Sequence, residues 1–399
     1  MRRFLFIIIC IGSFLVIDLM LQYKQTLDIP VIPEYTLKNS WLISLTNEFS
    51  NYIDSSLKAA NAPGAAYVVI KDGEIIAIKA FGVKETGTSD SVDVHTLFRL
   101  GSVSKGFAGI LTGMLVDEKL VRWNDQVVKY VPDFCLSDSK ATLKVTINDL
   151  LNHTTGLPVH SFTNMIEEGK SYEELKERLK ELPLAGKPGK VFTYQNVAFS
   201  IIAEVAQTAT GIKYTDLLKQ KIFFPCKMYD ASDTYEEMMS SQNMAKPHIL
   251  TRKGYITKSI TPDYYAFTPA AGVNASISDL SGYLLAITGK DTSFLSDSTR
   301  EAIFRPVIKT PRQLHNWKKI KKMYYAKGWR VIALANDSII YHGGYVTGYH
   351  AAIAIYPKDN LAIAFLFNYI GNLPNECIPD FFNMYFEFKE KEKIKPQIK

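Results

Sequence analysis

Residues 101–105, Gly-Ser-Val-Ser-Lys, combine a hydroxyl nucleophile with an amine that could activate it. Ser102 and Lys105 are three positions apart, a spacing that puts two side chains on one helix face with their Cβ atoms about 5–6 Å apart. Ser104 directly precedes Lys105 and diverges from it by about 100° around a helix axis. Ser102 is therefore predicted to be the reactive serine. The start of a helix also offers unpaired N–H groups that favour negative charge on an attacked carbonyl.

The Ser-x-x-Lys spacing alone is weakly specific, because such a pair most often belongs to a solvated helix face. The chain repeats the spacing at two other places, Ser55/Lys58 and Ser137/Lys140. The surroundings of Ser102 differ, since a glycine precedes it and residues 102–118 have the apolar spacing of a helix. One side of that helix is predicted to carry Phe107, Ile110, Leu111, Met114 and Leu115.

A serine hydroxyl needs a base, because it is a poor nucleophile unaided. Lys105 could be that base if burial lowers its pKa, or it could stay charged and lower the pKa of a neighbour. Tyr194 and Asn196 form the only Tyr-x-Asn among 22 tyrosines, and a phenol beside an ammonium can become a phenolate. The alternative is structural: Tyr194 packs in a core and Asn196 caps the following helix.

A third segment, His342-Gly343-Gly344, lies between two apolar runs that are typical of strands. Two glycines allow another backbone, such as an extended substrate, to approach closely. The Tyr345 N–H could join that of Ser102 as a two-donor oxyanion hole. The alternative is a Gly-Gly hairpin turn with a partly exposed histidine.

The remaining pattern predicts an α/β (α+β) fold. Residues 65–82 read as a hairpin around an Asp-Gly turn, and further strands follow from about residue 329. Helical patterns occupy residues 41–60, most of the middle of the chain and residues 374–388. We therefore expect one central antiparallel sheet built from both chain ends, flanked by helices, with an inserted, mostly helical lobe over roughly residues 119–320.

Composition excludes several other classes. Hydrophobic residues make up 47% and charged residues 22%, which are ordinary globular values. The net charge of +6 is partly local, near residues 318–322 and in the charged tail 389–399, so no nucleic-acid partner is expected. No metal or other cofactor is expected either, because four of the histidines lack metal-ligand spacing: His160, His248, His315 and His350.

The N-terminus has the pattern of an export signal, with two arginines before an apolar run. Residues 1–22 are interpreted as a signal peptide or a membrane anchor, with the anchor slightly favoured, and residues 23–40 as a tether. The rest of the chain is then expected outside the cytoplasm. Three cysteines follow the leader: Cys135, Cys226 and Cys377. Because their number is odd, they cannot all pair within one chain, and they show no CxxC spacing. They are interpreted as buried apolar side chains.

Taken together, the three motifs resemble those of the serine β-lactamase and penicillin-binding-protein clan, and within it the class C β-lactamase-like serine hydrolases. Ser-Val-Ser-Lys, Tyr-Gln-Asn and His-Gly-Gly follow the family's order and similar spacing. Flanking segments such as "LLNHTTGLP" and "HGGYVTGYHAAIAIYP" also look like family segments, and the resemblance covers roughly residues 45–388. It implies a catalytic domain over residues 41–388.

The resemblance also implies roles for the site residues. Ser102 would be acylated, Lys105 and Tyr194 would share general acid/base work, and Asn196 would hold Lys105 and the substrate amide. His342 and Gly344 would line the substrate-binding strand, with Tyr345 completing the oxyanion hole.

Two departures weaken a strict β-lactamase assignment. The family's Lys-Thr-Gly is replaced at His342 and Gly343, as in related D-amino-acid peptidases and esterases. Ala271 stands where class C enzymes often have a tyrosine that covers the ligand.

The expected function is acyl-enzyme hydrolysis of β-lactams, D-amino-acid peptides or esters by a monomer. The alternative is a membrane-tethered sensor of β-lactams or muropeptides that binds or acylates without turnover. A structural protein with a dead fold is disfavoured, because Ser102, Lys105, Tyr194 and Asn196 are all present.

Overall fold

One antiparallel sheet joins the two ends of the described chain. The computed structural model describes residues 40–311 and 320–394, so the predicted leader and tether lie outside the described residues. The eight strands follow the order β2-β1-β12-β11-β10-β9-β8-β7, so the first strand pairs with the last. Their bounds are Gly64–Lys71 (β1), Glu74–Gly82 (β2), Ile308–Lys309 (β7), Lys322–Ala326 (β8), Trp329–Ala333 (β9), Ser338–Val346 (β10), Tyr349–Tyr356 (β11) and Leu361–Phe367 (β12).

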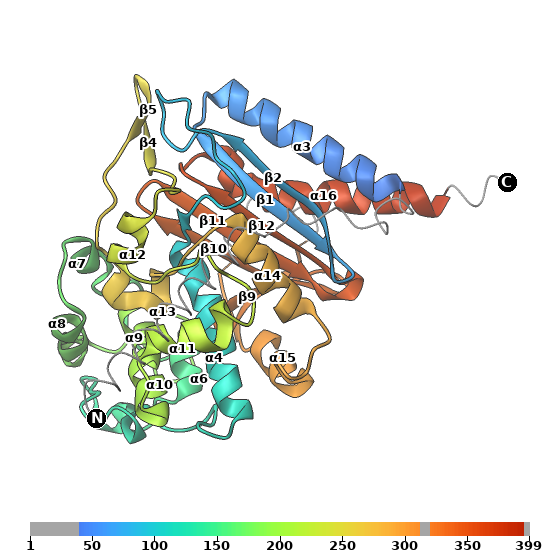
Figure 1. The fold of residues 1–399 in the computed structure, drawn as a ribbon. Coiled ribbons are helices and arrows are strands. Elements are labelled where there is room, and N and C mark those ends of the chain that lie inside the picture. Colours follow the sequence, from blue (N-terminus) through green and yellow to red (C-terminus); the bar gives the residue numbers. More distant parts are fainter. Residues whose placement is uncertain (1–39, 312–319, 395–399) are drawn as a thin grey trace, which may run out of the picture.

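Two helices from opposite ends of the chain cover one face of this sheet (Figure 1). They are α3 (Ser40–Ala60) and α16 (Asn372–Ile394). Phe49 of α3 is fully buried between them, with ring centroids 5.6 Å from Tyr67, 5.7 Å from Phe365 and 5.2 Å from Phe381. Edge-to-face aromatic contacts of this kind stabilise a core beyond simple area burial.

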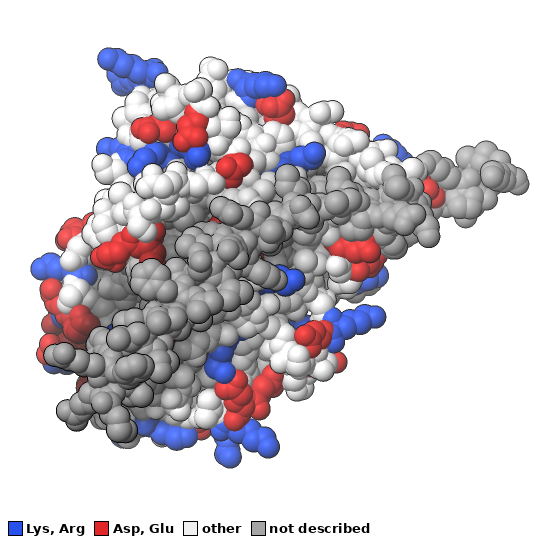
Figure 2. All heavy atoms as spheres, viewed as in Figure 1, with Lys and Arg blue, Asp and Glu red and all other residues white. Residues whose placement is uncertain are grey.

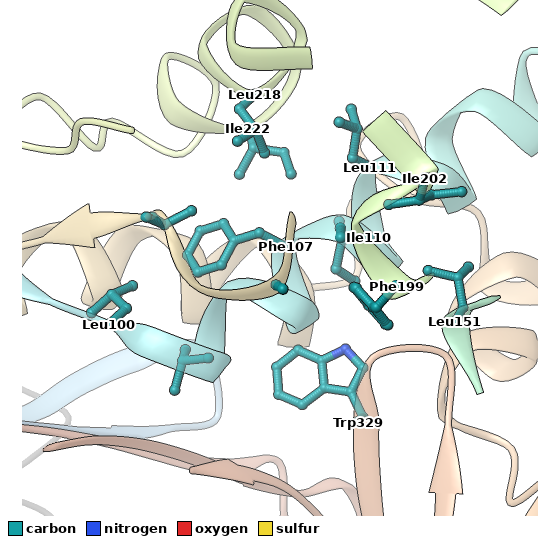
Figure 3. Packing of buried hydrophobic residues seen from close by; sticks show 14 of the residues in the cluster. Leu100, Phe107, Ile110, Leu111, Leu151, Phe199, Ile202, Leu218, Ile222 and Trp329 are labelled. Carbon is teal, nitrogen blue, oxygen red and sulfur yellow. The ribbon is translucent and has the colours of Figure 1, made fainter. Parts of the chain in front are cut away.

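The helical lobe lies on the other face and packs around α4 (Ser104–Asp117). All five apolar residues predicted on one side of this helix are buried, and so is every other residue from Ser104 to Leu115. Figure 3 shows the reason: Phe107 and Ile110 point to different neighbours, with Trp329 of β9 on one side and helices of the lobe on another. A helix buried on all sides gives Lys105 no route to solvent along its own surface.

Short helices form the rest of the lobe and its flanks. They are α5 (Ser139–Thr142), α6 (Ile147–Leu151), α7 (Thr163–Glu167), α8 (Tyr172–Glu177), α9 (Asn196–Ser200), α10 (Ile202–Thr210), α11 (Tyr214–Leu218), α12 (Tyr235–Ser240), α13 (Thr268–Ala271), α14 (Ile277–Thr288) and α15 (Asp297–Phe304). Two small sheets accompany them, β3 (Phe98–Arg99) with β6 (Asn274–Ala275) and β4 (His248–Thr251) with β5 (Gly254–Thr257).

Local sequence signals predict several of these boundaries correctly. The Asp-Gly turn joins β1 to β2, and Thr146 and Asp149 form the predicted capping box of α6. The helix predicted after Tyr194 is divided into α9 and α10, where the Ser200 hydroxyl donates to the Asn196 carbonyl at 2.9 Å. Such back-bonding bends helices. The last helix is longer than predicted and continues into the predicted tail.

Charged side chains of both signs are interspersed over the described part of one molecular face (Figure 2). Within the described residues, no helix has the length and apolar character needed to cross a membrane.

Replacing Phe49 with alanine is expected to destabilise the fold by about 3–5 kcal/mol, because the cavity lies where α3, α16 and the sheet meet. Denaturant unfolding of the variant measures the loss. Phe224→Ala is the matched control, since that side chain is 54% exposed and its removal should change stability by less than about 0.5 kcal/mol. Equal losses in the two variants would contradict the assignment of Phe49 to the core.

Candidate active site

Ser102 lies in a 3₁₀ turn, η1 (Gly101–Val103), that runs directly into α4. Its hydroxyl is 3.3 Å from the Lys105 amine, one turn further on. The predicted pairing of Ser102 with Lys105 is therefore present in the geometry, although the reactive position precedes the α-helix rather than belonging to it.

Three oxygens, two of them from distant segments, surround the buried Lys105 amine. Besides Ser102, it donates to Asn196 Oδ1 at 2.8 Å and to the Ala270 carbonyl at 2.9 Å. No carboxylate of the described residues forms an ion pair with it. Burial, and to a lesser degree the positive charge of Arg330, holds the pKa of Lys105 well below its usual range. Asn196 thus uses its side chain on Lys105 rather than as a helix cap.

Tyr194 is the second residue that acts on the Ser102 hydroxyl, whose proximity lowers the pKa of its phenol. Its ring packs 4.2 Å from the ring of His153, and the Lys105 amine lies 4.7 Å from its centre. Burial raises the pKa of Tyr194 to about 12, against smaller lowering effects of Ser102 and Arg330. These directions favour an uncharged Lys105 and a protonated Tyr194 over the phenolate that the sequence also allowed.

The third motif lies inside β10 rather than in a turn. Gly343 and Gly344 pair with Ala352 and Ala351 of β11, so the alternative of a Gly-Gly hairpin turn is wrong. His342 is also not partly exposed: only 1% of it is accessible, with Nδ1 2.8 Å from the Gly343 carbonyl and Nε2 3.0 Å from the Tyr325 hydroxyl. Burial, Arg330 and Lys105 keep its pKa well below the usual range.

At position 344 a side chain would clash with the protein's own backbone, so glycine is needed there whether or not a substrate is bound. A Cβ atom there would lie 2.0 Å from the Leu100 carbonyl and 2.8 Å from the Ser102 nitrogen. Gly101 is constrained from the other side, with φ of +52° and a Cβ position 2.7 Å from the Tyr345 carbonyl oxygen. The two glycines therefore let β10 lie directly against the turn η1, which carries the candidate nucleophile Ser102 and is called the nucleophile turn below. This contact brings the Ser102 and Tyr345 backbones together.

These residues open into one cleft with a volume of about 980 Å³. Its walls include all the candidate residues with side chains except the buried Lys105, and they extend to the rim of the helical lobe and to the start of α16. The cleft-lining residues include Ser102, Glu167, Tyr194, Asn196, Tyr264, Arg330, His342 and Tyr345.

Arg330 is a cleft residue that the motifs did not indicate. Its guanidinium lies 5.7 Å from the ring centre of Tyr194 and 5.8 Å from that of Tyr325. It forms no ion pair with a carboxylate of the described residues. An arginine within the otherwise apolar strand "GWRVIAL" is the signal that could have identified it. The Ala270 carbonyl had no such signal, since a backbone group has no side-chain identity.

A model of the Beta-lactamase family matches residues 49–379, which include every candidate site residue. The chain belongs to the Beta-lactamase family. Individual relatives are distant. "Unguisins hydrolase ungD" of Aspergillus violaceofuscus is 26% identical over 84% of this chain and 63% of its own length. "Protein flp" of Staphylococcus aureus MRSA252 is 24% identical over 84% of this chain and 65% of its own length. The chain thus spans less than two thirds of these relatives.

The fold of this β-lactamase-family chain is also found in a solved structure. The octameric penicillin-binding protein homologue from Pyrococcus abyssi matches with a TM-score of 0.75 and 23% identity, over 86% of this chain and 77% of that one. The predicted α/β architecture with a central antiparallel sheet is therefore confirmed.

The other sequence candidates lie apart from the cleft. Lys58 pairs with Asp54 at 2.6 Å, and the Ser137 hydroxyl donates to the Leu182 carbonyl, so neither repeats the Ser102 arrangement. Of the three cysteines, Cys226 and Cys377 are buried as expected, but Cys135 is exposed, and all three are free thiols. His315 lies outside the described residues, within which no group of three metal-ligating side chains gathers.

Gly344→Ala is expected to lower kcat by about 10²–10³-fold if the Tyr345 N–H is an oxyanion donor as predicted, because the added methyl group separates β10 from the Ser102 turn. Steady-state ester hydrolysis measures the loss. Gly343→Ala is the matched control, since its new methyl group would meet only the end of the Tyr341 side chain. Similar rates for both variants would contradict the proposed contact between β10 and the turn.

Proposed function

We propose that this chain is a serine hydrolase that forms a covalent acyl-enzyme on Ser102 with amide or ester substrates. The observation that carries the proposal is the position of one hydroxyl 3.3 Å from a buried amine, in a cleft that the Tyr194 phenol also lines. Membership of the Beta-lactamase family and the similarity to a hydrolase of Aspergillus violaceofuscus support it.

An uncharged Lys105 is well placed to act as the base. A neutral amine has two N–H donors and one lone pair. The Asn196 and Ala270 oxygens can take the two N–H groups, which leaves the lone pair for the Ser102 hydroxyl. The Ser102 proton then moves to Lys105 as its oxygen bonds to the substrate carbonyl carbon.

Backbone N–H groups would stabilise the negative charge that develops on the carbonyl oxygen. The Ser102 and Tyr345 N–H groups would donate to this oxyanion, at the point where β10 lies against the nucleophile turn. Tyr194, which is protonated in the free enzyme, would donate its proton to the leaving group as the acyl bond breaks, and the proton held by Lys105 would restore the phenol. Water then attacks the acyl-enzyme with the same base, and Ser102 is released.

In the family's Lys-Thr-Gly motif, the lysine is the cation that recognises the substrate carboxylate. In this cleft a different cation would have that role. Burial lowers the pKa of His342, which disfavours its charged form, and Gly343 has no hydroxyl. Arg330 brings a guanidinium into the same cleft, where no carboxylate of the described residues pairs with it. Substrates that carry a carboxylate, such as β-lactams and D-amino-acid peptides, are therefore favoured over neutral esters. Arginine suits this role because its planar donors match a carboxylate.

Ser102→Ala is expected to abolish both turnover of a p-nitrophenyl ester and labelling by a fluorophosphonate or a fluorescent penicillin. Persistent labelling of the variant would place the nucleophile elsewhere. Turnover must also continue beyond one equivalent in the native chain, since a single burst without further product would support the non-turnover sensor instead.

Arg330→Gln is expected to lower kcat/KM for a carboxylate-bearing substrate by about 10- to 100-fold, the range for a lost charged hydrogen bond. A matched pair of thioesters, with mercaptoacetate or mercaptoacetamide as leaving group, tests this; on the pH-independent plateau of each variant, only the anionic member should lose rate. Because Arg330 lowers the pKa of Lys105, its removal should also move the acidic limb of kcat/KM to higher pH. Equal losses for both thioesters would refute carboxylate recognition by Arg330, and Arg330→Lys is the charge-conserving control.

A further inference from the structure

Two side chains on the cleft wall are joined across its rim. Tyr264 precedes the 3₁₀ turn η5 (Tyr265–Phe267), and Glu167 is the last residue of α7. The Tyr264 hydroxyl donates to Glu167 Oε1 at 3.0 Å, although 97 positions separate them in the chain. Both residues line the same cleft as Ser102. This hydrogen bond therefore connects two segments at the mouth of the candidate active site.

The loop that carries Tyr264 is anchored beside the nucleophile. Arg99 of β3 is buried three positions before Ser102, and its guanidinium donates to the Thr261 carbonyl at 3.0 Å and to the Asp263 carbonyl. The same guanidinium lies 4.5 Å from the ring centre of Tyr265. Residues 261–265 thus have a fixed position relative to Ser102, because the charged Arg99 guanidinium binds their backbone carbonyls and the Tyr265 ring.

The rim is also where the backbone is strained. Tyr264 has φ of +71°, and the facing segment contains His160 at +55° and Phe162 at +61°. Bulky residues rarely adopt the left-handed conformation, and such residues persist where the surrounding structure fixes them, often at ligand-binding sites. Tyr264, which has this conformation, lines the cleft.

The bridge lies on the side of the cleft where Asn196 projects. The Asn196 amide is 3.5 Å from the Thr163 hydroxyl, to which it donates, and Thr163 begins α7. Glu167 is four positions further on, which is one turn along the same helix face. The wall that starts at Asn196 therefore ends at the Tyr264–Glu167 bridge. Asn196 is the residue expected to face the amide of the acyl group.

We propose that Tyr264 and Glu167 form an acyl-group selector, which closes the cleft beyond Asn196 and disfavours bulky acyl groups. This inference rests on the proposed function, since it assumes acyl transfer to Ser102. The bridge is exposed to solvent at Glu167, so a substrate can open it at the cost of one hydrogen bond. A short acyl group leaves the bridge intact, whereas a bulky one must break it.

Tyr264→Phe removes the bridging hydroxyl and keeps the ring. For the full chain, we expect kcat/KM for p-nitrophenyl phenylacetate to rise by about 3- to 10-fold, the range for one net hydrogen bond. The value for p-nitrophenyl acetate, which has the same leaving group, should change by less than about twofold. Glu167→Ala should have the same effect, and the double variant should add nothing, because both substitutions remove one bond.

Two further variants are controls for this experiment. Glu167→Gln retains an acceptor oxygen and should keep the native ratio of the two esters. Glu168→Ala removes the neighbouring exposed carboxylate, whose partner is Asn164 on α7, and should also keep it. An unchanged ratio in both Tyr264→Phe and Glu167→Ala, or a lower rate with phenylacetate, would overturn the selector. Failure of the proposed function looks different, since Ser102→Ala would then still hydrolyse the esters.

Discussion

The site depends on one constraint: the Lys105 amine is buried, and no carboxylate of the described residues pairs with it. A charged ammonium at this position would be costly, because burial in a low dielectric favours the uncharged form. The amine is instead satisfied by the oxygens of Asn196, Ala270 and Ser102. These oxygens come from α9, α13 and η1, so three parts of the helical lobe must be placed accurately around α4. The burial of α4 on every side follows from the same requirement.

The sheet contributes to this site by close backbone contact rather than by side-chain packing. β10 can lie against the nucleophile turn only because Gly344 and Gly101 have no Cβ atoms there. That contact needs a rigid strand, and β10 has one because it is paired with β9 and β11 in the middle of the sheet. Pairing of β1 with β12 joins strands from the two ends of the chain in this same sheet, so the sheet that organises the fold also positions β10 beside Ser102.

Local patterns predicted what depends on local chemistry. The hairpin of β1 and β2, the capping box of Thr146 and the converging motifs at Ser102, Tyr194 and His342 were all recognisable from residue type and spacing. Burial was less predictable, because it depends on what packs around a segment. The alternative of a partly exposed His342 was therefore wrong, and α4 is buried on every side, not only on its predicted apolar side. The Ala270 carbonyl, Arg330 and the Tyr264–Glu167 bridge were missed, since tertiary structure alone brings them to the cleft.

Burial disfavours the charged forms of Lys105 and His342. Acceptance of a proton and binding of a substrate anion are therefore tasks for different side chains in this cleft. An amine that must accept a proton cannot also be a permanent anchor for an anion, and burial has made both side chains poor anchors. Arginine cannot be deprotonated under ordinary conditions. Arg330 can therefore attract a carboxylate at any pH at which Lys105 works as a base, while its field helps to keep Lys105 uncharged. When a bound carboxylate neutralises Arg330, that field weakens and Lys105 becomes more basic. An anionic substrate would thus raise the basicity of the amine that is proposed to take the Ser102 proton.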